Sequence, residues 1–129
     1  MVRDAFVKQQ TANKSSCRVM KCHNASKEDL IKRGKTIHDN TFKLQRIAGS
    51  TVSKAHLTIQ KAMQAGANDA HLATARLRLR EAQWYWDYAA AENGVGFHNL
   101  DQIARTLGLS IDLAYQAIEE ANAVVRGAL

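Results

Sequence analysis

Apolar residues recur at helical spacing along three stretches of this chain, of which the first is the longest. Its large apolar residues run beside a row of small ones, a pattern typical of a helix that lies close against another helix. The large row is Leu30, Ile37, Leu44, Val52, Ile59 and Met63, and the small row is Gly34, Thr41, Ala48, Ala55 and Ala62. The pattern predicts one helix over residues 26–65, about 60 Å long at the usual rise per residue.

Residues that favour helix ends lie at both ends of this stretch. The Ser26 hydroxyl can cap the free amides of the first turn, and Asp29 three residues on completes a capping box. Gly66 fits the carboxyl end. A helix of this length has to pack along another helix or a second subunit.

The second stretch predicts a helix over residues 69–93, capped by Asn68 or Asp69 and ended by Asn93-Gly94. Its segment 84–88 holds four of the eight aromatic residues, which we interpret as core or interface packing. The face predicted to be buried consists of Leu72, Ala75, Leu79, Ala82, Trp86, Ala89 and Ala90.

The third stretch predicts a helix over residues 100–126, capped by Asn99 with Gln102 three residues later and ended by Gly127. Its apolar stripe has a regular helical period. The stripe consists of Ile103, Leu107, Ile111, Ala114, Ile118, Ala121 and Val125.

Composition agrees with long, uninterrupted helices. The 129 residues include no proline and only seven glycines, and 46% are hydrophobic. A chain of this length is one domain by size. We therefore predict an all-α fold, a long helical hairpin plus a third helix. No apolar run approaches the roughly 18 residues that a membrane span needs.

Residues 1–25 contain the first candidate chemistry, Cys17 and Cys22 with His23 directly after the second thiol. Two thiols and an adjacent imidazole are the groups that attach a haem covalently and ligate its iron, although the usual spacing is C-x-x-C-H. A disulfide across the four intervening residues fits an oxidising compartment. A zinc site lacks a fourth ligand. The motif alone leaves these interpretations open. A further possibility is that the two thiols are unrelated to each other and to the histidine.

A second candidate is His98, in the short loop 94–99. Two glycines in this loop let its backbone approach something bulky. A histidine facing a flat cofactor and an ordinary solvated histidine both fit this position. His38, His56 and His71 are interpreted as ordinary helix histidines.

Charge is uneven along the chain. Residues 1–54 hold twelve Lys or Arg and four acids, net +8, whereas residues 55–129 hold six and eight, net −2. This excess of positive charge fits a solvated face. It also fits the binding of haem propionates, an anionic substrate or an acidic redox partner. Nucleic acid is not favoured, because no aromatic residues interleave with the scattered lysines.

Several segments together resemble the carboxy-terminal helical region of the pentahaem ammonia-forming cytochrome c nitrite reductases. The most specific part is an Ala-Gln-Trp-x-Trp-Asp sequence followed by Gly-Phe-His. The segments that carry the resemblance, within residues 2–125, are 52–56, 65–67, 80–87, 91–98, Leu107-Gly108 and Ala114.

The resemblance implies roles for four residues. Cys17 and Cys22 would hold the vinyl groups of the family's fifth haem, and His23 would be its proximal ligand. The family has C-x-x-C-H here, so this loop is two residues longer. His98 would be the distal ligand of the neighbouring fourth haem. No residue stands in a motif for the calcium site, the catalytic haem or nitrite binding, so no catalytic residue is named.

The resemblance also implies a multihaem cytochrome c type fold and a C-terminal fragment that delivers electrons for the six-electron reduction of nitrite to ammonium. It implies a periplasmic homodimer formed through the long helices and supplied by a quinol-oxidising cytochrome. The first residues lack the apolar stretch of a secretion signal. We therefore expect either a different biological start or a piece of a longer protein. The alternatives are a small monohaem carrier with His23 and His98 as its ligand pair, and a haem-free helical interaction module.

Overall fold

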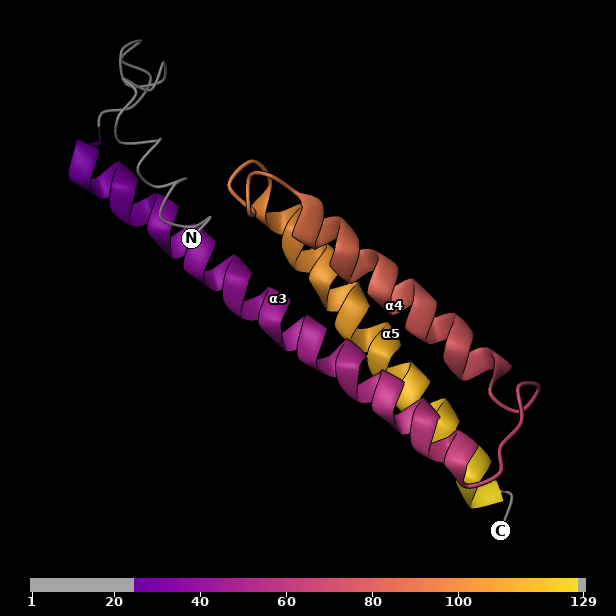
Figure 1. Ribbon diagram of the computed structural model, residues 1–129. Helices are drawn as coiled ribbons and strands as arrows, with labels where there is room; N and C mark the ends of the chain where they lie inside the picture. Colours follow the sequence, from indigo (N-terminus) through magenta and orange to yellow (C-terminus); the bar gives the residue numbers. More distant parts are fainter. Residues whose placement is uncertain (1–24, 128–129) are drawn as a thin grey trace.

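The computed structural model describes residues 25–127, and these form three α-helices (Figure 1). They are α3 (Lys27–Gln64), α4 (Ala73–Ala91) and α5 (Leu100–Gly127). α4 runs antiparallel to α3, and α5 returns in the direction of α3 (Figure 1). The most extensive contacts join α5 to each of the other two helices. The predicted all-α fold is confirmed, and its third helix packs against both arms of the hairpin.

Small residues build much of the core, which lets the helix axes approach closely. Fully buried alanines come from all three helices: Ala48, Ala55, Ala62, Ala75, Ala82, Ala114, Ala117 and Ala121. Four of the five residues in the predicted small row of α3 are buried, namely Thr41, Ala48, Ala55 and Ala62. The largest fully buried apolar side chains among the described residues are Leu72, in the turn before α4, and Leu107 of α5.

Two residues of the predicted apolar stripes lie outside the core. Met63 is exposed, because it lies at the carboxyl end of α3 where its sulfur is 3.3 Å from the Arg76 guanidinium. Ala90 is also exposed, whereas its neighbour Ala89 is buried against α3 and α5. Each is the second-last residue of its helix, where the neighbouring helices cover less of the surface.

The end of α3 has the geometry that Gly66 suggested. Gly66 has φ +99°, its N–H donates to the Met63 carbonyl at 3.0 Å, and the Ala67 N–H donates to the Ala62 carbonyl at 3.1 Å. These two bonds form a Schellman motif, which satisfies carbonyls at the end of the helix.

The start of α4 differs from the sequence prediction. Asn68 accepts a hydrogen bond from the His71 N–H at 3.0 Å, but this bond closes a separate turn, and α4 begins only at Ala73. Leu72 occupies the N-cap position without a side-chain cap. The predicted start at residue 69 is therefore wrong, because a local side-chain bond stabilises a turn as readily as a helix end.

Two polar contacts fix how the helices pack. The Trp86 indole N–H donates to the Gln45 carbonyl at 3.0 Å, so the ring lies across α3 beside Gly49. The buried Ser110 hydroxyl of α5 donates to the Ala82 carbonyl of α4 at 2.8 Å. Each bond ties a side chain of one helix to the backbone of another.

The aromatic segment of α4 divides between core and surface. Trp86 is half-buried, whereas Trp84 is 60% exposed and stacks on the exposed Tyr88 with ring centroids 5.7 Å apart. The packing interpretation of this segment therefore holds for Trp86 but not, within this chain, for Trp84 and Tyr88. None of the described helices combines the length and the apolar character needed to cross a bilayer.

Candidate functional site

Of the predicted site residues, only His98 lies in the described part of the chain, since Cys17, Cys22 and His23 fall outside residues 25–127. His98 belongs to the loop that joins α4 to α5, residues 92–99. This loop lies beside α3, well inside the length of that helix (Figure 1). The candidate site is therefore built from this loop and the α3 surface beneath it.

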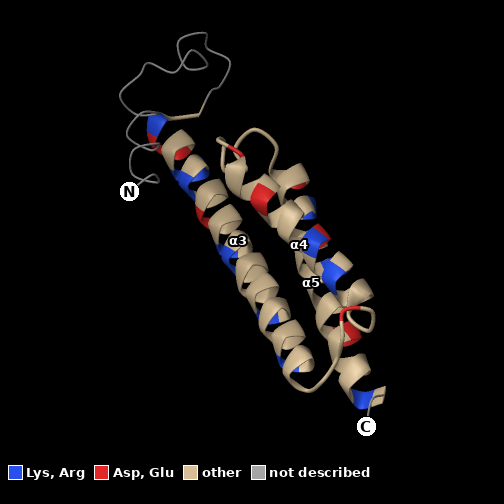
Figure 2. Ribbon diagram, turned by 45° about the vertical axis from the view of Figure 1, so that its right-hand side comes forward, with Lys and Arg blue, Asp and Glu red and all other residues tan. Residues whose placement is uncertain are grey.

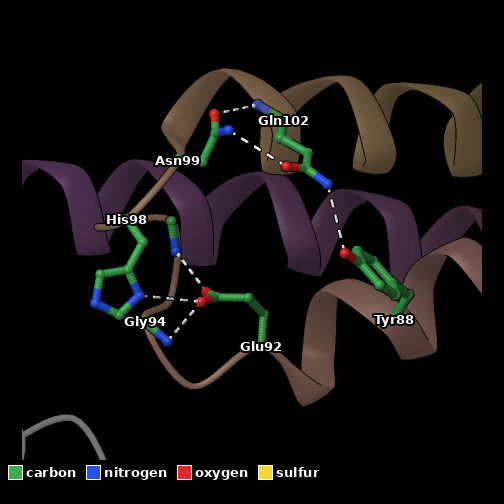
Figure 3. Close-up of polar contacts among 7 residues, drawn as sticks. Tyr88, Glu92, Gly94, His98, Asn99 and Gln102 are labelled. Carbon is green, nitrogen blue, oxygen red and sulfur yellow. Dashed lines mark hydrogen bonds and ion pairs between the residues drawn. The ribbon is translucent and has the colours of Figure 1, made fainter.

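The Glu92 carboxylate organises the loop. One of its oxygens accepts the Gly94 N–H at 2.8 Å, and the other accepts the Gly96 N–H at 3.1 Å (Figure 3). Two nearby residues have positive φ, Val95 at 46° and Gly96 at 80°. Backbone N–H groups turned inward in this way form a concave anion site, and here the chain supplies the anion itself.

The loop depends on the absence of side chains at two positions. A Cβ at Gly94 would come within 2.7 Å of a Glu92 oxygen and would also overlap the His98 ring. A Cβ at Gly96 would overlap the Thr41 hydroxyl of α3. The two glycines therefore let the backbone approach Glu92 on one side and α3 on the other.

Contacts with α3 complete the support of the loop. Phe97 extends toward Gly34, whose Cβ position lies 3.9 Å from the phenyl ring. Thr41 is buried beneath the loop, and its hydroxyl forms no hydrogen bond with any residue in the described range. The small residues of α3 thus form the surface on which the loop packs.

The imidazole of His98 faces Glu92 on one side and solvent on the other. Its Nδ1 lies 3.6 Å from a Glu92 oxygen, an ion-pair distance that is longer than a hydrogen bond. The side chain is 75% exposed, and Figure 3 shows its other ring nitrogen turned away from Glu92. The Phe97 ring stands nearly perpendicular to the imidazole, with centroids 6.2 Å apart.

The surroundings of Glu92 lower its pKa. Burial by itself favours the neutral acid and raises the pKa. The N–H groups of Gly96 and then Gly94, followed by His98, stabilise the carboxylate more strongly, so the net pKa lies below the ordinary glutamate value. The loop is therefore held by a charged carboxylate at neutral pH.

A second set of polar contacts holds the start of α5. Asn99 accepts the Gln102 N–H at 3.0 Å, as the predicted cap requires, and its amide donates to the Gln102 side chain at 3.3 Å (Figure 3). Gln102 in turn donates to the Tyr88 hydroxyl of α4 at 3.4 Å. These bonds fix the helix that follows His98 to the helix that precedes the loop.

The remaining described histidines lie away from the loop or beneath it. His38 is buried on α3, and His56 on the same helix contacts the Gln83 amide oxygen at 3.2 Å. His71 lies in the turn before α4 rather than in a helix, because α4 starts later than expected. Residues 25–127 contain no cluster of three His, Cys, Asp or Glu side chains placed to hold a metal ion.

The basic character of the amino-terminal half extends along α3. Figure 2 shows Lys and Arg spaced along this helix from its first turn onward. They are Lys27, Lys32, Arg33, Lys35, Lys43, Arg46, Lys54 and Lys61. The loop thus lies beside a positively charged helix, a setting that favours an anionic group or partner.

Sequence reasoning identified His98 and its two glycines but missed Glu92. A carboxylate one residue past the end of a helix has no distinctive pattern, and its role appears only when the positive φ angles turn two N–H groups toward it. The spacing Glu-x-Gly-x-Gly-x-His is present in the sequence, but by itself it does not indicate this role.

The geometry of His98 fits that of a histidine that ligates iron. Such a histidine commonly gives its second ring N–H to a carboxylate, a carbonyl or water. His98 places Nδ1 toward a carboxylate and leaves Nε2 directed away from it, on a largely exposed ring. His98 is therefore the described residue whose surroundings resemble those of a metal-ligating histidine, with one ring nitrogen beside a carboxylate and the other exposed.

Comparison with known proteins places the chain in a family. The family model described as Cytochrome c552 matches residues 7–128. Similar proteins are the cytochromes c-552 of Bacteroides fragilis strain YCH46, 36% identical over 105 residues, and of Porphyromonas gingivalis, 34% identical over 113 residues. These matches cover 79% and 81% of this chain but only 20% and 21% of the relatives. The chain thus spans about a fifth of their length, and it belongs to the cytochrome c552 family, the ammonia-forming cytochrome c nitrite reductases, whose members bind c-type haems.

Proposed function

We propose that this chain is the carboxy-terminal, haem-bearing part of a cytochrome c nitrite reductase and acts in electron transfer during the reduction of nitrite to ammonium. The family match supports the assignment, since it extends over residues 7–128. The observation that carries the proposal is the position of His98. Its imidazole has the Glu92 carboxylate on one side and is exposed to solvent on the other.

Four residues would hold haem. Cys17 and Cys22 would form thioethers, His23 would be a proximal ligand, and His98 would ligate the iron of a neighbouring haem through Nε2. An iron held by two histidines has no open position for nitrite, so such a haem supplies one-electron transfer rather than substrate binding. Residues 25–127 contribute by positioning the ligand, because the loop fixes His98 and α3 supports the loop.

Catalysis is assigned to the part of the protein beyond this chain. A match to a fifth of the relatives leaves room for the catalytic haem, the remaining haems and a calcium site outside it. We propose that the protein works in the periplasm as a homodimer joined through its long helices and receives electrons from a quinol-oxidising cytochrome. Exposed apolar residues on α3, among them Phe42, Ile47 and Leu57, support the dimer.

The experiment that tests the proposal is expression of the chain in a host with working cytochrome maturation. We expect covalent haem, detected by the mass of the purified protein and by a Soret band that survives denaturation. The variant Cys17→Ser/Cys22→Ser should lose both signals while keeping its helical circular dichroism spectrum. Colourless protein with two reactive thiols would refute haem attachment and support the helical interaction module instead.

A second measurement separates the reductase part from a self-contained carrier. In a monohaem carrier, His23 and His98 would ligate the same iron, and the isolated chain would show a six-coordinate low-spin spectrum that His98→Gln converts to high spin. If His98 serves a neighbouring haem, His98→Gln leaves the spectrum of the isolated chain unchanged. Nitrite-dependent ammonium production by the isolated chain would contradict the assignment of catalysis to the missing part.

A further inference from the structure

We infer that Glu92 is the positioning residue of His98: its carboxylate holds the imidazole in the tautomer with the proton on Nδ1 and leaves the lone pair of Nε2 available to a hydrogen-bond donor or a metal. The inference deepens the proposed function, because it concerns the residue behind the proposed ligand. It rests on that function for its biological meaning but not for its test.

The geometry of the loop leaves one oxygen of Glu92 facing the ring. That oxygen accepts the Gly94 N–H and lies 3.6 Å from His98 Nδ1, while the second oxygen accepts the Gly96 N–H. The two backbone bonds prevent the carboxylate from turning away. A neutral imidazole carries its proton on one ring nitrogen or the other, and a fixed negative charge beside Nδ1 favours the proton there.

No other charged side chain competes for Nδ1 among the described residues. The ion pairs of the described chain other than Glu92–His98 lie elsewhere, between Arg76 and Asp69, Arg78 and Glu81, Arg105 and Asp101, and Arg126 and Glu119. The opposite side of the ring is open, since His98 is 75% exposed. The orientation of this ring is therefore set by one carboxylate.

The loop links this positioning to α3. Gly96 donates to Glu92 and at the same time packs on Thr41, so the carboxylate, the backbone and the long helix form one continuous set of contacts. A carboxylate behind a metal-bound imidazole raises the basicity of the ligating nitrogen, which favours the more highly charged, oxidised metal. Glu92 is thus placed to affect both the direction and the electron donation of the proposed ligand.

The test is NMR of the histidine ring nitrogens in the 129-residue chain without haem, at a pH where the imidazoles are neutral. The His98 signals are assigned by their loss in His98→Gln. We expect Nδ1–H to predominate in the wild-type chain. In Glu92→Gln, which removes the charge and keeps an oxygen for a backbone N–H, we expect a shift to Nε2–H, the form that free histidine prefers.

A second variant and an internal control complete the experiment. Glu92→Asp keeps a carboxylate, so it should retain more of the Nδ1–H form than Glu92→Gln does. His56 contacts a neutral amide, and its tautomer should not change in either variant. A wild-type His98 protonated on Nε2, or a tautomer ratio that is the same in wild type and Glu92→Gln, overturns the inference.

The haem-loaded protein provides a separate readout. If His98 ligates a haem iron, Glu92→Gln should raise the midpoint potential of that haem, because a less basic ligand stabilises the oxidised iron less. A chain that binds no haem but shows the expected tautomers would refute the proposed function and keep the role of Glu92. Failure of the proposed function can therefore be distinguished from failure of the inferred role of Glu92.

Discussion

Gly96 is the residue on which the contact between the loop and α3 depends. Its φ of +80° disfavours any side chain, and a Cβ there would overlap Thr41. A residue with a Cβ in the left-handed region costs about 1–2 kcal/mol before the overlap is counted. We expect Gly96→Ala to lower the free energy of unfolding by about 2–4 kcal/mol, measured by urea denaturation.

Two further variants show whether the overlap causes the loss. Gly108 lies within α5 with nothing within 4 Å of its Cβ position, so Gly108→Ala should stabilise the chain by about 0.5–1 kcal/mol. Thr41→Ala removes the hydroxyl that Gly96→Ala would meet, and in that background the cost of Gly96→Ala should decrease. An equal cost in both backgrounds would assign the loss to backbone strain alone.

The lowered pKa of Glu92 predicts a dependence of stability on pH. A carboxyl whose pKa is lower in the folded than in the unfolded chain stabilises the fold above its unfolded pKa. That stability is lost as the pH falls through the folded pKa. We expect Glu92→Gln to cost about 1–2 kcal/mol at neutral pH and progressively less as the pH falls below the ordinary glutamate range.

Urea titrations at neutral and acid pH measure this difference. Glu119→Gln is the control, since Glu119 forms an exposed ion pair with Arg126 at 3.8 Å. Its effect should be small at both values of pH. A cost for Glu92→Gln that does not change between them would show that the charge of Glu92 is not what stabilises the loop.

At the scale of the helices, Trp86 and Gly49 determine how closely α4 approaches α3. A Cβ at Gly49 would lie 2.9 Å from the Trp86 indole nitrogen, the atom that donates to the Gln45 carbonyl. We expect Gly49→Ala to destabilise the chain by about 1–2 kcal/mol, although alanine favours a helix. In the Trp86→Ala background the same substitution should become stabilising. A double-mutant cycle by urea denaturation measures this change of sign, and additive effects would contradict it.

The helices were predictable because each carries its own periodic pattern, whereas several of their ends and the loop contacts were not. The stripes of α3 and α5 identify their buried faces directly, and Ser26 caps α3 by accepting the Asp29 N–H at 3.1 Å, as expected. Asn68 gave a wrong predicted start for α4, because its side chain closes a turn instead of capping that helix. Glu92 acquires its role only when the loop folds back on it, and no local pattern records that event.

For the molecule as a whole, α3 has a side that α4 and α5 do not cover. α3 has 38 residues against 19 in α4 and 28 in α5, and its exposed side includes Ile47 and Leu57. Apolar side chains exposed along a long helix are suited to pack against a second copy of that helix. We expect the chain to sediment as a dimer.

The variant Ile47→Glu/Leu57→Glu tests whether this surface forms the dimer. Burying two carboxylates in an apolar helix contact costs several kcal/mol, so the dimer should dissociate at concentrations where the wild type is fully associated. The helical signal should remain, because both residues are exposed within one chain. Ala104→Glu places a charge on an exposed position of α5 and should leave the dimer intact. A wild-type chain that sediments as a monomer would contradict the expected dimer, and a double variant that remains dimeric would show that Ile47 and Leu57 do not form its contact.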